Sequence, residues 1–179
     1  MKHIFKLSGA LLMDQLIGVI AGFMWVLCIT IANNMLFKND LIGYALALII
    51  CFGLFAYITY NSAFKSGFHD SHRAIKDMEY KGYLYKGVFA GIISAVPLLI
   101  LYMIYRTTGS GIVAVYFQLA NMYWTWPMIK IFPNHLQLVM VLAFVPMVII
   151  PWIGYIAGYK NFMVTDILLK CYKRYTEKE

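Results

Sequence analysis

The sequence predicts an all-α integral membrane protein: a bundle of four transmembrane helices with an outer interfacial or re-entrant segment and a C-terminal amphipathic cytoplasmic helix. Of its 179 residues, 62% are hydrophobic, and four long apolar stretches lie at about 9–37, 41–61, 87–105 and 136–159. A hydrocarbon core of about 30 Å needs about 20 apolar residues per helix, which each stretch supplies with modest tilt or bilayer thinning. Residues 1–179 therefore form a single polytopic membrane domain.

The basic residues predict the orientation of this bundle. If the N-terminus is inside, twelve of the fifteen lysines and arginines fall on the cytoplasmic side, and only Lys38, Arg106 and Lys130 fall on the other. This asymmetry follows the positive-inside rule and predicts a multi-pass protein of the cell (plasma) membrane with both termini in the cytoplasm. Topology and attraction to anionic lipid account for the net charge of +7. We therefore expect anionic membrane lipids as partners, and no nucleic acid.

The first two stretches predict a helical hairpin. Lys2, His3 and Lys6 precede the first stretch as they would in a signal peptide, but the apolar run is about twice the length of a signal h-region, so we expect it to remain as the first helix. Only a few residues separate it from the second stretch, so the two helices run antiparallel. Apolar residues at helical spacing, including Phe64 and Phe68, suggest that the second helix continues beyond the membrane.

The segment 112–126 is apolar and aromatic but contains Gln118, Asn121 and Thr125. A fifth span here would carry the basic C-terminal tail to the outside and break the charge rule. We therefore expect an outer interfacial or re-entrant helix. Its aromatic side chains should lie at the membrane interface: Tyr116, Phe117, Tyr123, Trp124 and Trp126.

The tail after the fourth stretch predicts a surface helix at 163–175. Its apolar residues Val164, Ile167, Leu168 and Cys171 cluster on one face, with charged residues opposite. A basic amphipathic helix directly after a span lies most simply in the headgroup region.

Three GxxxG steps predict close helix packing. The pairs are Gly18 and Gly22, Gly87 and Gly91, and Gly154 and Gly158, each toward the cytoplasmic half of a different span. Small residues four apart let helix backbones approach closely in lipid. Packing within one monomer is favoured over a homo-oligomer seam, because the chain has enough helices to fill these grooves.

Polar residues inside the first stretch raise the possibility of a transport path. Asp14 and Gln15 lie in its first half, and Asn33 and Asn34 lie near its end. A carboxylate within a span usually has a function. However, Asp14 follows Lys6 by eight residues, about 12 Å at helical rise, so a position near the interface as a solvated or lysine-paired acid is the simpler interpretation.

A polar cluster follows the second stretch: His69, Asp70, His72, Arg73 and Asp77. The two histidines are three residues apart and are weak candidates for metal ligands, because Arg73 and Lys76 disfavour a cation and no stronger metal motif accompanies them. Arg73 and Asp77 have the spacing of a helical ion pair. A docking surface for a cytoplasmic partner is the better interpretation.

Motifs for catalysis are missing from the sequence. Cys28 and Cys51 lie in apolar surroundings without a neighbouring His or Lys, and with Cys171 they are expected to be free thiols. No glycine-rich phosphate loop or nucleophile elbow occurs. We therefore predict no catalytic residue and no cofactor, and an enzyme is the less favoured class.

Three classes of function remain open. The favoured one is a non-enzymatic subunit, accessory protein or scaffold that acts within a membrane complex or homo-oligomer. The second is a small transporter or channel with a polar path near Asp14 and Gln15. The third is a lipid-headgroup enzyme at the cytoplasmic face that uses His69, Asp70, His72 and Asp77.

Overall fold

The computed structural model describes residues 2–36, 40–76 and 84–161, and this part of the chain is almost entirely helical. The elements are α1 (Lys2–Leu36), α2 (Asp40–Lys76), α3 (Lys86–Thr108), α4 (Gly111–Ala120), α5 (Met122–Ile131), a 3₁₀ turn η1 (Pro133–His135), α6 (Leu136–Leu142) and α7 (Phe144–Tyr159). Four segments within the described residues are long and apolar enough to cross a membrane: Ile4–Met24, Gly43–Lys76, Lys86–Thr108 and Pro133–Tyr159. The predicted all-α membrane bundle is thereby confirmed. The predicted surface helix at 163–175 lies outside the described residues.

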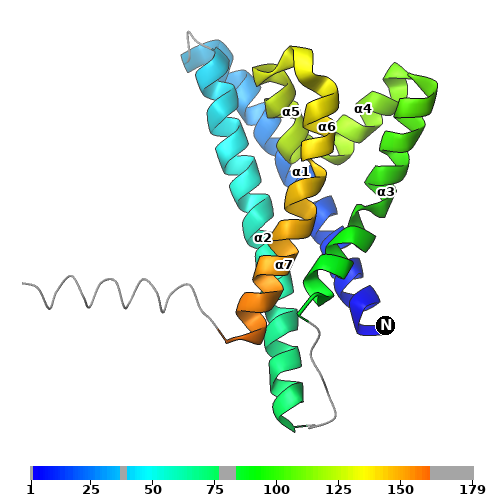
Figure 1. The fold of residues 1–179 in the computed structure, drawn as a ribbon. Coiled ribbons are helices and arrows are strands. Elements are labelled where there is room, and N and C mark those ends of the chain that lie inside the picture. The colour runs from blue at the N-terminus through cyan, green and yellow to red at the C-terminus, as the bar shows by residue number, and fades with distance from the viewer. Residues whose placement is uncertain (1, 37–39, 77–83, 162–179) are drawn as a thin grey trace, which may run out of the picture.

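The helices form an open bundle (Figure 1). Helices α1 and α2 are antiparallel, α7 lies along α2, and α3 crosses the first half of α1 and leans away from it toward the top of the view. The first turns of α1, the last part of α2 and the start of α3 lie at the lower end in Figure 1. These segments contain Lys6, Lys65, Arg73 and Lys86, and we call this the basic end. The charge pattern predicts that the basic end is cytoplasmic.

Helices α4 and α5 form a re-entrant hairpin between α3 and α6, at the end of the bundle opposite the basic end (Figure 1). At its turn the buried Asn121 donates from Nδ2 to the carbonyl oxygen of Phe117, at 3.2 Å. The buried Thr125 hydroxyl contacts the carbonyl oxygens of Gln118 and Asn121, at 3.2 and 2.9 Å. The carbonyl oxygens of Phe117 and Asn121 also accept from the backbone N–H groups of Asn121 and Thr125, so the side-chain bonds serve to give the buried side chains of Asn121 and Thr125 hydrogen-bond partners. The turn therefore explains two of the three polar residues of the segment.

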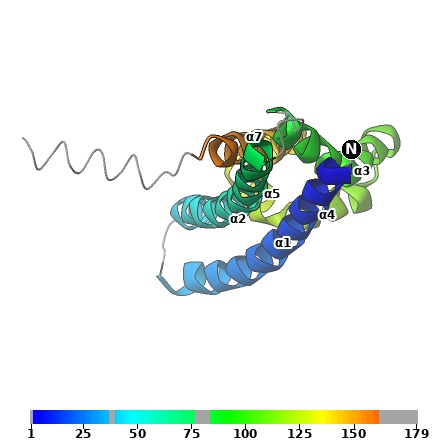
Figure 2. The ribbon, with the colours of Figure 1, turned by 90° about the horizontal axis from the view of Figure 1, so that it is seen from below.

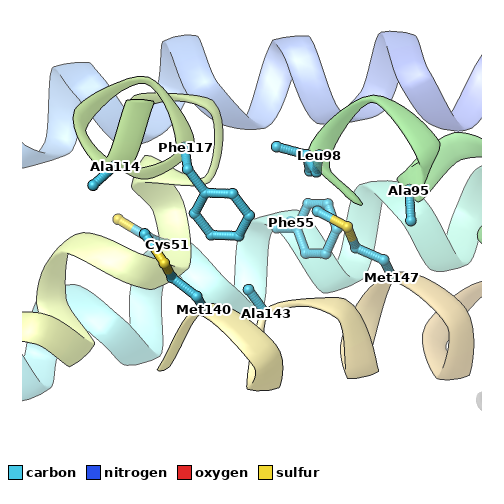
Figure 3. Close-up of a cluster of buried hydrophobic side chains, with 9 residues drawn as sticks. All are labelled: Cys51, Phe55, Ala95, Leu98, Ala114, Phe117, Met140, Ala143 and Met147. Atoms are coloured by element: carbon cyan, nitrogen blue, oxygen red, sulfur yellow. The ribbon is translucent and has the colours of Figure 1, made fainter. Parts of the chain in front are cut away.

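Phe117 corrects one expectation. Its side chain was predicted to lie at the membrane interface, but it is fully buried, whereas its neighbour Tyr116 is exposed. Because the hairpin enters the bundle, one face of α4 packs against other helices. Figure 3 shows Phe117 within the main apolar cluster, which comprises Cys51, Phe55, Ala95, Leu98, Ala114, Phe117, Met140, Ala143 and Met147.

Glycines position α7 between α2 and α3. A Cβ at Gly87 or Gly91 of α3 would lie 2.5 Å from the Pro151 carbonyl oxygen or 2.6 Å from that of Met147, both on α7. A Cβ at Gly154 would lie 2.7 Å from the Tyr60 carbonyl oxygen of α2. Real Cβ atoms do not approach backbone so closely, so these helices meet at distances that only glycine allows. Since lipid is as apolar as leucine, such backbone contact is a main source of helix association in a membrane.

Two further glycines complete the α2–α7 contact. A Cβ at Gly158 of α7 would overlap the Phe64 carbonyl, and one at Gly67 of α2 would overlap the Tyr155 carbonyl. Gly67 belongs to none of the predicted GxxxG pairs. Gly18 and Gly22 of α1 are buried and lie beside Phe55 and Ile58 of α2. The close α2–α7 contact brings Tyr155 against the last turns of α2.

Candidate functional site: a basic cavity beside a buried ion pair

Three helices contribute one charged or polar side chain each to a buried cluster at the basic end. Lys86, the first residue of α3, contacts Asp70 of α2 with Nζ and Oδ2 2.5 Å apart. The Tyr155 hydroxyl of α7 donates to the same Oδ2 at 2.7 Å. Only 3% of Asp70, 5% of Lys86 and none of Tyr155 is exposed. The ammonium of Lys86 also lies 5.5 Å from the centre of the Tyr155 ring.

Physical chemistry requires these groups to be paired. A buried charge without a partner costs several kcal/mol, and it is tolerated when an opposite charge and hydrogen bonds compensate it. Lys86 and Tyr155 provide that compensation for Asp70, and the lysine gains a cation–π contact. The cluster therefore fixes the start of α3 and the end of α7 against α2.

Beside this cluster lies a cavity of about 360 Å³ between α1, α2 and the start of α3. We call it the basic cavity, and its lining residues are Lys6, Leu7, Ala10, Ser62, Lys65, Ser66, His69, Asp70, Arg73 and Lys86. Figure 2 views the bundle from this end, with the first turns of α1 beside α3 and the lower part of α2.

The charge of the basic cavity is strongly asymmetric. Lys6, Lys65, Arg73 and Lys86 line it, and Asp70 is the one carboxylate among its lining residues. With His69 neutral, the lining carries a formal excess of three positive charges. The hydroxyl of Ser66 adds a hydrogen-bond donor. Such a site attracts an anion and repels a metal cation.

Asp14 and Gln15 lie behind the basic cavity, in the first half of α1. Asp14 is 8% exposed and has a side-chain hydrogen bond with Ser62, which lines the cavity. Its Oδ2 is buried without a hydrogen-bond partner within the part of the chain that the structure describes. Gln15 contacts the Ser94 hydroxyl of α3 through Nε2, at 3.4 Å. Asp14 therefore adjoins the basic cavity, and Gln15 contacts α3.

A second cavity, of about 590 Å³, opens between α1, α3 and α4. Gln15 lines it together with apolar residues such as Leu12, Pro97 and Leu101. Asn33 and Asn34, the other residues of the predicted path, lie in the last turns of α1. They are about 29–30 Å from Asp14 along the helix at 1.5 Å per residue, and the structure does not bring them together.

The residues of the predicted docking cluster separate in the structure. His69 and Arg73 line the basic cavity, whereas Asp70 is buried in the ion pair. The His72 ring packs edge-on against Phe68, with ring centroids 4.3 Å apart. Asp77, and with it the predicted pairing with Arg73, lies outside the described residues. Among the residues that the structure describes, no group of three or more His, Cys, Asp or Glu side chains could hold a metal ion.

Sequence reasoning did not identify Tyr155, Ser62 or the pairing of Asp70 with Lys86. Tyr155 lies inside the Gly154–Gly158 step, and that position was the only signal of its contact with α2. No match with known proteins adds to this description: no protein-family model, no curated protein and no solved structure matches the chain. The geometry at the basic end is therefore the basis for a functional proposal.

Proposed function

We propose that this polytopic membrane protein is a non-enzymatic accessory or scaffold protein that binds the phosphodiester headgroup of an anionic phospholipid in the basic cavity. The observation that supports the proposal is the set of Lys6, Lys65, Arg73 and Lys86 around one cavity whose single lining carboxylate is already engaged by Lys86 and Tyr155. Guanidinium, ammonium and hydroxyl donors together form the usual chemistry of phosphate recognition in proteins.

The position of the cavity favours a lipid over a free anion. It lies where the apolar part of α1 begins, because Leu7 and Ala10 line it together with Lys6. Exposed apolar side chains such as Phe5 and Met13 flank this part of α1 and face the surroundings of the bundle. A phosphate held here would therefore stay at headgroup level while its acyl chains remain in the membrane.

The state of Asp70 supports binding over catalysis. A carboxylate that acts as a general base needs to reach a substrate proton, but the Asp70 Oδ2 is held by Lys86 and Tyr155. His72 packs on Phe68 instead of facing the cavity, since it is not among the lining residues. A lipid-headgroup enzyme built on these residues is therefore the less favoured proposal.

The test is a calorimetric titration of the detergent-solubilised protein with soluble short-chain lipids. Dihexanoyl phosphatidylglycerol should bind, and dihexanoyl phosphatidylcholine should bind at least tenfold more weakly. Sulfate and glycerol phosphate distinguish the sources of the anion: if they bind as well as the anionic lipid, the ligand is a free anion. Lys65→Gln and Arg73→Gln should each weaken binding about fivefold, from about 1 kcal/mol per basic residue.

Lys76→Gln is the matched control, because Lys76 is an exposed lysine of α2 outside the basic cavity. It should leave the dissociation constant within about twofold of the wild-type value. Equal weakening by the control and by Lys65→Gln would show that only the general charge of this end attracts the lipid, and the proposed site would be wrong.

A transporter is the second candidate, and the positions of Asp14 and Gln15 favour it. These neighbours on α1 adjoin two different cavities, since Asp14 bonds to Ser62 of the basic cavity and Gln15 lines the cavity beside α4. Transport can be measured as uptake or release of labelled anionic lipid headgroups by proteoliposomes. Movement that requires the protein, and that decreases with Gln15→Leu, would support transport over simple binding.

A further inference from the structure

Asp14 is a buried acid that headgroup binding alone does not explain. It lies within the first membrane-spanning segment and is 8% exposed, with its Oδ2 buried and without a hydrogen-bond partner within the described part of the chain. A carboxylate in such a position is costly unless it is neutralised or paired. Its placement therefore indicates that the Asp14 carboxyl group binds a proton or another positively charged partner.

The neighbours of Asp14 connect it to the basic cavity. Ser62 forms a hydrogen bond with the carboxylate and also lines the cavity. Lys65, the cation that acts on Asp14 electrostatically, lines the same cavity. Ala10, one helical turn before Asp14, is part of the lining too. The carboxylate thus lies about one turn deeper than the cavity, behind Ser62.

The charges on each adjoining element determine how Asp14 responds to a ligand. On α2 these are Lys65, His69 and Arg73, and on α1 the nearest is Lys6, all of which line the basic cavity. On α3, Lys86 is held by Asp70, while Ser94 contacts the neighbouring Gln15. An anion in the cavity would face these same cations, including the lysine that compensates Asp14.

An anion and an ionised Asp14 would therefore both be compensated by Lys65. Two negative charges close together disfavour each other's ionised forms, and Asp14 is the buried one of the two. The bound phosphodiester stays ionised because it is a strong acid, so the carboxylate is the group that is neutralised. It forms an O–H bond with a proton taken from the solvent, and no other bond changes.

We propose that Asp14 is a proton-binding site coupled to the basic cavity, so that the anionic headgroup and one proton bind together. This rests on the proposed headgroup binding and extends it: the proton becomes a second ligand of the same site. Because linkage is reciprocal, a pH at which Asp14 is ionised in the free protein weakens headgroup binding, and a lower pH strengthens it.

Calorimetry of dihexanoyl phosphatidylglycerol binding in buffers of different ionisation enthalpy tests the proposal, because it counts the protons taken up. The phosphodiester is a strong acid that keeps its charge over the pH range near neutrality, so the lipid's own titration does not contribute. The wild type should take up close to one proton per lipid bound over part of this range. There, the dissociation constant should rise up to tenfold per pH unit as pH increases.

Asp14→Asn should still bind the lipid, with no proton uptake and no pH dependence. Asp40→Asn, an acid at the far end of α2, is the matched control and should behave as the wild type. His69→Gln should keep the number of protons taken up per lipid bound, whatever its affinity for the lipid, which would show that the titrating group is not the histidine of the cavity. Uptake that persists in Asp14→Asn, or that is missing in the wild type, would overturn the coupling.

A second measurement on the wild type covers the case in which Asp14→Asn fails to fold. Dicyclohexylcarbodiimide modifies protonated carboxyl groups in apolar surroundings, and peptide mass spectrometry locates the modified residue. Labelling of Asp14 at pH 7.5 should increase at least threefold when dihexanoyl phosphatidylglycerol is bound. Unchanged labelling, or binding that requires sodium instead of a proton, would contradict the inference. If no variant and no wild-type sample binds the lipid, the proposed function itself fails.

Discussion

Gly158 offers a direct test of how α7 is held against α2. An added Cβ would overlap the Phe64 carbonyl and lie 2.9 Å from the Phe68 backbone nitrogen. Both neighbours are backbone atoms of a long helix, so the clash is relieved only if the two helices move apart. Overpacking of this kind costs about 1–3 kcal/mol, and replacing glycine with alanine in a helix gains up to about 1 kcal/mol in helix propensity. Gly158→Ala should therefore destabilise the protein by the difference between these two contributions.

Gly53 provides the matched control within the same bundle. It lies inside α2, and a Cβ there would meet nothing within 4 Å. Gly53→Ala gains the same helix propensity without the clash, so it should be neutral or stabilising by up to about 1 kcal/mol. The two variants are thus expected to differ by about 1–3 kcal/mol, because the propensity term is common to both.

The assay is equilibrium unfolding of the detergent-solubilised protein by sodium dodecyl sulfate, followed by circular dichroism and by the reactivity of the buried Cys51 thiol. Gly158→Ala should shift the midpoint to lower denaturant mole fraction, and the thiol should become reactive at the same point. Equal midpoints for Gly158→Ala and Gly53→Ala would refute the close α2–α7 contact.

Further predictions concern the buried cluster, the hairpin and the topology. Tyr155→Phe should lower the free energy of unfolding by about 1.5–3 kcal/mol in the same assay, because it removes a hydrogen bond to a charged group; an unchanged midpoint would argue against the bond to Asp70. Phe117→Ala should cost about 3–5 kcal/mol, whereas an interfacial side chain would cost less than about 1 kcal/mol. In a cysteine-free background, a membrane-impermeant thiol reagent should label Thr108→Cys from outside intact cells and should label Lys76→Cys only after lysis. The reverse pattern would invert the predicted orientation.

The membrane fold could be predicted from sequence because the bilayer imposes it locally. Each span must supply about 20 apolar residues and satisfy its own backbone, so composition and length identify it without knowledge of any partner. The same reasoning identified 112–126 as an irregular segment, since a fifth span would have conflicted with the charges. It could not place Phe117, because aromatic residues are common both at interfaces and in cores, and only the re-entrant path of α4 decides between them.

The site was less predictable because its residues meet across the chain. Asp70 lies 16 residues from Lys86 and 85 from Tyr155, and no local pattern encodes either contact. From the sequence, we expected Asp70 to lie with its neighbours on an exposed polar face of the helix. Instead, the close approach of α7 at Gly67 and Gly158 buries it. Asp14 was expected to be a solvated or lysine-paired acid near the membrane interface, but it is only 8% exposed. Its connection to the basic cavity depends on Ser62, which only the packing of α1 on α2 reveals.

The most direct test of the proposed headgroup site is the lipid that stays with the protein through purification. The protein extracted from its membrane in mild detergent should retain anionic phospholipid, enriched at least threefold over the bulk membrane, as measured by mass spectrometry of the extracted lipids. The double variant Lys65→Gln/Arg73→Gln should lose this enrichment, and Lys76→Gln should keep it. Retained lipid with the composition of the bulk membrane, or enrichment that survives the double variant, would contradict anionic headgroup binding in the basic cavity.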